Sequence, residues 1–162
     1  MTVTVELDAQ YRQLREECGL LVRGRGFIDV LGPDGAEYLQ GQLTNDVEAV
    51  GVGEGQYAAL LDRKGRMQAD LRVLRVGEDA ILLDTEPATK DVALRHLTMY
   101  SIGRDVQVGD ASAERGAVSL IGPRAAEIAG TPPLPEFANE TTTIAGTEVV
   151  AQPATPIGLL LG

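Results

Sequence analysis

A carboxylate in the middle of an apolar strand is the first group in this sequence whose type and position suggest chemistry. Asp70 lies within residues 67–74, a segment with the alternation of a β-strand, although aspartate is disfavoured in strand interiors. Arg72 follows two residues later, so both side chains project from one strand face, and the guanidinium can stabilise the ionised carboxylate. Two interpretations remain open. Asp70 either serves a ligand site or forms a solvated pair with Arg72 on an exposed sheet face, which is the commoner arrangement.

A β-hairpin is expected to position this carboxylate. Two apolar runs, residues 57–61 and 67–76, are joined by the charged turn 62–66. The second run places four apolar residues on the face expected to meet the core, namely Met67, Ala69, Leu71 and Val73. Its other face begins polar near the turn and becomes apolar further along. A third strand at 80–84 completes an antiparallel meander.

The rest of the chain alternates predicted helices and strands. Apolar residues at helical spacing predict helices at 10–18, 34–47 and 87–100. Further strands are expected at 106–108 and 117–121, before a short helix that ends at 128, and segment 20–31 indicates either a strand pair or one long strand with a glycine break. We divide the chain into three portions. Residues 1–50 form a helix-strand-helix portion, and residues 51–115 form the meander with its covering helix. Residues 116–162 begin a further segment that stops within its fold.

Composition and charge narrow the class of protein. The chain has 162 residues, 44% of them hydrophobic, and no apolar run approaches the roughly 20 residues of a membrane helix. Its formal net charge of −10 argues against nucleic acid, whose binding relies on Lys and Arg neutralising phosphates. The amino terminus lacks the pattern of a signal peptide, and a single cysteine fits a reducing compartment. We therefore expect a soluble, cytoplasmic protein with no nucleic-acid or membrane partner.

The remaining reactive side chains are expected to be structural. His96, the only histidine, lies beside the apolar stripe of a predicted helix. Neither a nucleophile motif nor metal-ligand spacing accompanies it, so a structural role is favoured and no metal site is expected. Cys18 is predicted on the inner side of a helix, where cysteine usually acts as a small hydrophobic residue.

Several ordered motifs, taken together, resemble one known family. They are residues 38–47 (YLQGQLTNDV), 64–71 (KGRMQADL), 81–84 (ILLD) and 120–125 (LIGPRA). In this order the motifs are similar to the amino-terminal part of the aminomethyltransferase superfamily, which includes the glycine cleavage T-protein and the folate-binding YgfZ-type proteins. The resemblance extends over most of the chain, so it is more specific than any single motif.

This resemblance implies a fold, a ligand and a site. The fold is α+β, with antiparallel and mixed sheets and covering helices beside a folate-binding channel, and the ligand is tetrahydrofolate. Asp70 matches the second of two acids on this strand, a pterin contact and the key catalytic group of the T-protein branch, whereas Ala69 replaces the first. Tyr57 matches a tyrosine that lines the same site. Asp84 stands where that branch has a pterin-binding asparagine, and its carboxylate can accept hydrogen bonds from pterin N–H groups.

Two candidate functions follow from the resemblance. In the T-protein branch, an aminomethyl group on the lipoyl arm of a carrier protein is transferred to tetrahydrofolate, and Asp70 would stabilise the cationic iminium character of that transfer. In the YgfZ-type branch, a folate-binding protein assists iron-sulfur client proteins without catalysis. The sequence leaves open whether this chain is an enzyme. It resembles only the amino-terminal half of either branch, so self-association or pairing with a carboxyl-terminal half is also expected.

Overall fold

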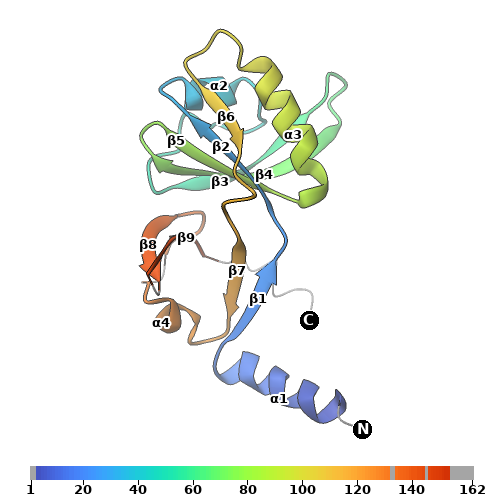
Figure 1. Cartoon of the computed structure of the whole chain (residues 1–162), viewed down its shortest axis with the longest axis vertical. Coiled ribbons are helices and arrows are strands. Elements are labelled where there is room, and N and C mark those ends of the chain that lie inside the picture. The colour runs from blue at the N-terminus through green and yellow to red at the C-terminus, as the bar shows by residue number, and fades with distance from the viewer. Residues whose placement is uncertain (1–2, 132–133, 145, 154–162) are drawn as a thin grey trace.

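The computed structural model describes residues 3–131, 134–144 and 146–153 (Figure 1). Its elements, in chain order, are α1 (Val3–Glu16), β1 (Gly19–Arg23), β2 (Gly26–Leu31), α2 (Gly35–Gln40), β3 (Gly55–Leu61), β4 (Met67–Gly77), β5 (Ala80–Thr85), α3 (Pro87–Tyr100), β6 (Gln107–Asp110), β7 (Ala117–Ile121), α4 (Ala125–Ala129), β8 (Glu140–Ile144) and β9 (Thr147–Ala151). The fold is α+β, as predicted, and the paired strands of the described residues are antiparallel.

A five-stranded sheet, ordered β3-β4-β5-β2-β6, forms the larger part of the molecule. Strands β3 and β4 are the hairpin predicted around Asp70, and β5 completes the predicted meander. Strand β2, from an earlier part of the chain, pairs with β5 on one side and with β6 on the other. Figure 1 shows α3 lying across this sheet, with β1, β7, β8 and β9 below it. We call β2–β6, α2 and α3 the sheet unit.

The main core lies between one face of this sheet and its helices. Ala69, Leu71 and Val73 of β4 are buried there, as the alternation predicts, together with Leu97 of α3. Met67 is exposed, against the prediction. It lies at the turn end of β4, where the register of β4 against β3 shifts, so the alternation that holds further along the strand does not carry Met67 into the core.

A buried tyrosine ties α2 to α3. The hydroxyl of Tyr38 donates a hydrogen bond to the backbone carbonyl oxygen of Leu97 at 2.5 Å, and both residues are buried. Burial disfavours the charged phenolate and raises the pKa of Tyr38 to about 12. The hydroxyl therefore remains a hydrogen-bond donor at any physiological pH, and it holds the two helices together over the sheet.

The helix predicted at 34–47 is shorter in the structure. Helix α2 ends at Gln40, whose side-chain Oε1 accepts a hydrogen bond from the backbone N–H of Val47 at 2.6 Å. Leu43 forms an isolated β-bridge with Leu60 instead of continuing the helix. Leu43 and Val47 are nevertheless buried. The apolar stripe thus predicted which residues are buried, whereas the side chain of Gln40 stabilises a turn that the stripe does not encode.

Two predictions near the amino terminus are corrected. Helix α1 begins at Val3 and ends at Glu16, so Cys18 lies beyond the helix and is half-buried rather than packed on its inner side. Strands β1 and β2 do not pair with each other. Strand β1 pairs with β7 in a two-stranded sheet, whereas β2 pairs with β5 and β6 in the sheet unit. The chain changes sheets between Arg23 and Gly26.

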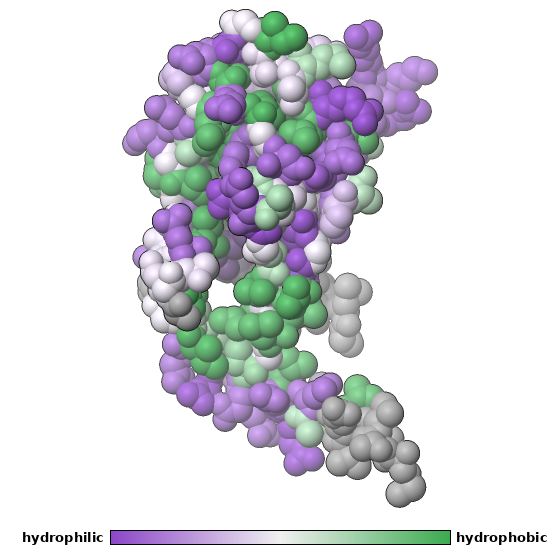
Figure 2. Space-filling view, viewed as in Figure 1, coloured by the Kyte–Doolittle hydropathy of each residue, from purple (hydrophilic) through white to green (hydrophobic). Residues whose placement is uncertain are grey.

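A second region, here called the extension, comprises β1, β7, α4, β8 and β9. It contains two separate two-stranded sheets, β1–β7 and β8–β9. Figure 2 shows apolar side chains gathered over β1 and β7, where Leu20, Val22 and Val118 are exposed. The segment before β8 is attached to the sheet unit by Asn139, whose Nδ2 donates a hydrogen bond to the carbonyl oxygen of Glu54 at 2.7 Å.

Strands from two of the predicted sequence segments meet in the sheet unit. Strand β2 comes from residues 1–50 and strands β3 to β6 from residues 51–115. The division of the chain at residues 50 and 115 into domain portions stays a prediction. None of the helices in the described part of the chain combines the length and apolar composition needed to cross a membrane.

Candidate functional site

The polar side chains of the hairpin belong to a row that crosses four strands. Tyr57 on β3 is opposite Arg72 on β4, Arg72 is opposite Asp84 on β5, and Asp84 is opposite Phe27 on β2. Residues in register share one sheet face, and this row lies on the face away from the main core. Asp70, two residues before Arg72, projects from the same face. The register thus brings all three predicted site residues to one side of the sheet.

Asp84 is the buried centre of this row. Its side chain is 1% exposed, and its Oδ1 accepts a hydrogen bond from Arg25 Nε at 2.5 Å. Its Oδ2 accepts one from the guanidinium of Arg72, while Arg25 also pairs with the exposed Glu86. A buried carboxylate requires such compensation, because an unpaired charge in the interior is costly. Both oxygens of Asp84 are therefore already engaged by arginines.

Asp70, in contrast, has a fixed backbone and an exposed carboxylate. The buried Thr85 donates a hydrogen bond from its hydroxyl to the backbone carbonyl oxygen of Asp70 at 2.6 Å. The carboxylate itself has no hydrogen bond or ion pair among the described residues. The solvated Asp70–Arg72 pair considered above does not form, because Arg72 pairs with Asp84 instead. Ala59, opposite Asp70 on β3, leaves the neighbouring surface free of a large side chain.

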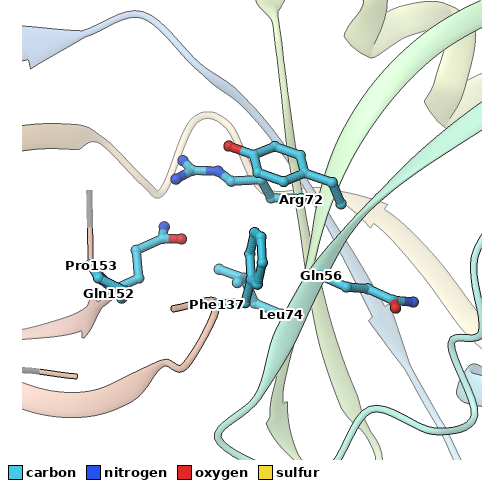
Figure 3. A pocket seen from close by; sticks show the side chains of 7 residues that line it. Gln56, Arg72, Leu74, Phe137, Gln152 and Pro153 are labelled. Carbon is cyan, nitrogen blue, oxygen red and sulfur yellow. The ribbon is translucent and has the colours of Figure 1, made fainter. Parts of the chain in front are cut away.

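A small hollow lies at the other end of the same face (Figure 3). Its lining residues are Gln56, Tyr57, Arg72, Leu74, Phe137, Gln152 and Pro153. The rings of Tyr57 and Phe137 meet edge to face, with centroids 5.7 Å apart. Figure 3 shows the side chains of Arg72 and Gln152 pointing toward the space beside Phe137, whereas Gln56 points away. The volume of the hollow is about 10 Å³, which is room for about one water-sized group.

Arg72 is the residue whose importance the sequence-based prediction missed. It lines the hollow and pairs with Asp84, and its Nε is buried with no hydrogen-bond partner in the described part of the chain. A buried N–H without an acceptor is costly, so it calls for an explanation. The available signal was the position of Arg72 two residues after Asp70, which we interpreted only as a counter-ion for that carboxylate.

The structure places the other candidate residues away from this face. His96 lies on α3, where its Nε2 is 3.0 Å from Oε1 of Gln42. Its ring contacts that of Tyr100 in a tilted arrangement, with centroids 4.6 Å apart. Burial lowers the pKa of His96 below its ordinary value. Among the described residues, no cluster of three or more His, Cys, Asp or Glu side chains could hold a metal ion.

The tip of the hairpin is held by its own aspartate. Asp62 accepts hydrogen bonds from the backbone N–H of Arg66, at 3.0 Å, and of Lys64, at 2.8 Å. Its other oxygen accepts a hydrogen bond from Arg66 Nε at 2.7 Å. The bonds from Arg66, followed by that from Lys64, lower the pKa of Asp62. Gly65 has a φ of +74°, which a glycine adopts without strain. The basic residues of the turn are thus presented at the end of the hairpin, beyond Asp70.

Sequence comparison now defines the class of protein. Residues 3–143 match the family described as the GCVT N-terminal domain, and because this match covers most of the chain, the chain belongs to that family. An aminomethyltransferase of Listeria monocytogenes serotype 4b is 34% identical over 123 residues, which are 75% of this chain and 34% of the relative. An aminomethyltransferase of Thermus thermophilus is 30% identical over 130 residues. The chain spans about a third of the length of the curated relatives it matches.

One solved structure agrees with this family assignment, and a second shares the fold. The glycine cleavage system aminomethyltransferase T from Bartonella henselae superposes with a TM-score of 0.72 at 26% identity, over 81% of this chain and 37% of that one. A chain of the heterotetrameric sarcosine oxidase from Corynebacterium sp. U-96 superposes with a TM-score of 0.57 at 20% identity, over 91% of this chain and 77% of that one. This second likeness shows a shared fold.

Proposed function

We propose that this chain supplies the pterin-binding face of an aminomethyltransferase-type protein that uses tetrahydrofolate. The observation that carries the proposal is the exposed carboxylate of Asp70 on the same sheet face as Tyr57, in a chain whose relatives are aminomethyltransferases. Thr85 anchors the Asp70 backbone, and the exposed carboxylate is open to a ligand. A carboxylate acceptor on an anchored strand suits the N–H groups of a pterin.

In this proposal Asp70 is the catalytic residue. Transfer of an aminomethyl group to tetrahydrofolate passes through a carbon that carries positive charge, and a carboxylate held close to it stabilises that charge. The aromatic ring of Tyr57 supports the ligand beside it. Asp84, predicted as a third contact, would have to release an arginine before it could accept a pterin N–H, because both of its oxygens are engaged.

The donor and the partners also belong to the proposal. A lipoyl carrier protein would bring the aminomethyl group, and the remaining two thirds of the relatives' length would close the site over Asp70. The exposed apolar residues of β1 and β7, including Leu20 and Val118, favour burial against a further protein segment, whether a carboxyl-terminal half or a second copy. The YgfZ-type alternative, with an iron-sulfur client, remains a prediction that no observation here favours.

Calorimetric titration of the chain with 5-formyl-tetrahydrofolate tests the proposal. Asp70→Asn keeps the size of the side chain and removes its charge, so we expect binding to weaken by roughly tenfold. Asp79→Asn, a matched change at an exposed position in the β4–β5 turn, should leave binding unchanged. Equal affinity of the Asp70→Asn variant and the parent would remove Asp70 from the site. A parent chain that binds no folate at millimolar concentration would overturn the proposed function.

A further inference from the structure

The contacts of Arg72 support an inference that rests on the proposed function and specifies how the ligand is bound. We propose that Arg72 determines the specificity of the site by donating a hydrogen bond to the ring carbonyl oxygen of a neutral lactam, such as the 4-oxo group of a pterin. In this proposal Asp84 is a positioning residue for Arg72 and makes no contact with the ligand. The assignment rests on the buried, unpartnered Nε of Arg72 and on the hollow that Arg72 lines.

Asp84 can position Arg72 because it is itself held in place. It is opposite Arg72 in the register of β4 and β5, and Arg25, the residue before β2, binds its other oxygen. One end of the Arg72 guanidinium is thereby fixed, while its Nε remains without an acceptor among the described residues. A planar guanidinium fixed at one edge presents its other N–H groups in a defined direction.

The hollow accepts an atom rather than a ring. With a volume of about 10 Å³, it has room for about one water-sized group, which is the size of a carbonyl oxygen. The rest of a planar ligand would lie outside it, over the sheet face toward Asp70, where Ala59 leaves the surface low. Tyr57 and Phe137, in edge-to-face contact, form the apolar wall at the Arg72 end.

The acceptor Asp70 and the donor Arg72 on this face match the polar edge of an aminopyrimidinone ring. Asp70 accepts hydrogen bonds and Arg72 donates them, and two residues along a strand separate them by about 7 Å. An aminopyrimidinone ring presents N–H donors and a carbonyl acceptor on one molecule. It therefore complements both side chains at once, with its N–H groups toward Asp70 and its oxygen in the hollow.

Local charge favours a neutral ring over a carboxylate. Arg25 and Arg72 are balanced by Asp84 and Glu86, with which they pair. The free carboxylate of Asp70 then makes this face negative. A second anion would be repelled by Asp70, whereas a neutral lactam oxygen would satisfy the Arg72 Nε without adding charge.

The test compares folic acid with its 4-amino-4-deoxy analogue, which replaces the ring oxygen by an amino group and so turns an acceptor into a donor. Both ligands are titrated into the full chain at a pH where both rings are neutral. We expect the parent chain to bind folic acid about tenfold more tightly than the analogue. Equal binding of the two ligands by the parent would overturn the role of Arg72 without use of any variant.

Variants separate ligand contact from structural support. Arg72→Lys keeps the charge but not the planar fork, so we expect the preference for folic acid to fall to within about twofold, whereas the control Arg75→Lys retains it. A merely structural role would weaken both ligands equally and leave the preference unchanged, which would overturn the inference. Should the parent bind both ligands equally and Asp70→Asn still weaken both, the proposed function would stand and the inference alone would fail. Binding of neither ligand would overturn both.

Discussion

Apolar strands are buried in the sheet unit but exposed in the extension. Leu83 on β5 is 0% exposed, whereas Leu20 on β1 is 65% exposed. The β-branched and aliphatic residues of β1 are as apolar as those of β5, so composition does not explain the contrast. Strand β5 lies between β4 and β2 and is covered by helices, while β1 has a single neighbour, β7. Apolar strands thus become core only where further layers cover them.

The ion pairs of the two regions also differ in burial. In the sheet unit, one buried carboxylate, Asp84, holds two arginines. In the extension, Arg124 pairs with two exposed carboxylates, Glu127 at 2.8 Å and Glu17, which lies between α1 and β1, at 2.5 Å. Hydrogen bonds to these carboxylates raise the pKa of Arg124. Solvent and salt screen such exposed pairs, so geometry alone does not make them stabilising.

Removing one carboxylate from each group of ion pairs should give the largest difference between the two regions. Asp84→Ala leaves two arginines without their buried partner, and we expect it to lower the free energy of unfolding by about 3–5 kcal/mol. Glu127→Ala should leave the urea midpoint unchanged within error, because its pair is exposed. Urea denaturation followed by circular dichroism measures both. A similar loss for the two variants would show that burial does not separate the clusters.

The local pattern of the sequence was sufficient to predict the hairpin but not the network within it. Alternation placed Asp70 and Arg72 on one face correctly, because period two is a local property of a strand. The partner of Arg72 depends instead on the register of β4 against β5, and Arg25 lies 59 residues before Asp84. Such pairings follow from tertiary contacts that no spacing along the chain encodes, so local spacing pointed to the wrong partner for Arg72.

The same limit explains the errors in the elements. The stripe through Leu39, Leu43 and Val47 predicted three buried residues, and all three are buried. The helix nevertheless ends at Gln40, because the side chain of Gln40 bonds to the backbone of Val47. For segment 20–31 the apolar pattern predicted strands correctly. Which sheet each strand joins depends on β7, β5 and β6, which lie far along the chain.

Matched truncations of leucine test whether the apolar contrast is energetic as well as geometric. Leu83→Ala opens a cavity in the main core, and we expect a loss of about 3 kcal/mol in the free energy of unfolding. Leu20→Ala removes a side chain that is already exposed, so we expect a change within about 0.5 kcal/mol. Thermal and urea unfolding of both variants provide the comparison. A large loss for Leu20→Ala would mean that β1 is buried in solution, for example against a second copy.

Removing single hydroxyl groups sharpens the comparison on a smaller scale. Tyr38→Phe deletes the hydrogen bond to Leu97 within the core, and we expect a cost of about 1 kcal/mol. Tyr11→Phe, in the exposed part of α1, removes an equivalent group in water and should cost nothing measurable. The midpoints of urea unfolding decide between them. If Tyr38→Phe were neutral, the link between α2 and α3 would not contribute to stability.

The smallest expected effect is a pH dependence confined to the sheet unit. Burial lowers the pKa of His96 in the folded state below its unfolded value of about 6.5. The unfolded chain therefore binds the proton more tightly, and the stability present above about pH 6.5 decreases as the pH falls through the unfolded and then the folded pKa. His96 is the only histidine, so His96→Gln should flatten the change in urea midpoint between about pH 7 and pH 5. If the urea midpoint of His96→Gln changed with pH as steeply as that of the parent, the pH dependence would arise from carboxylates. His96 on α3 would then make no contribution to it.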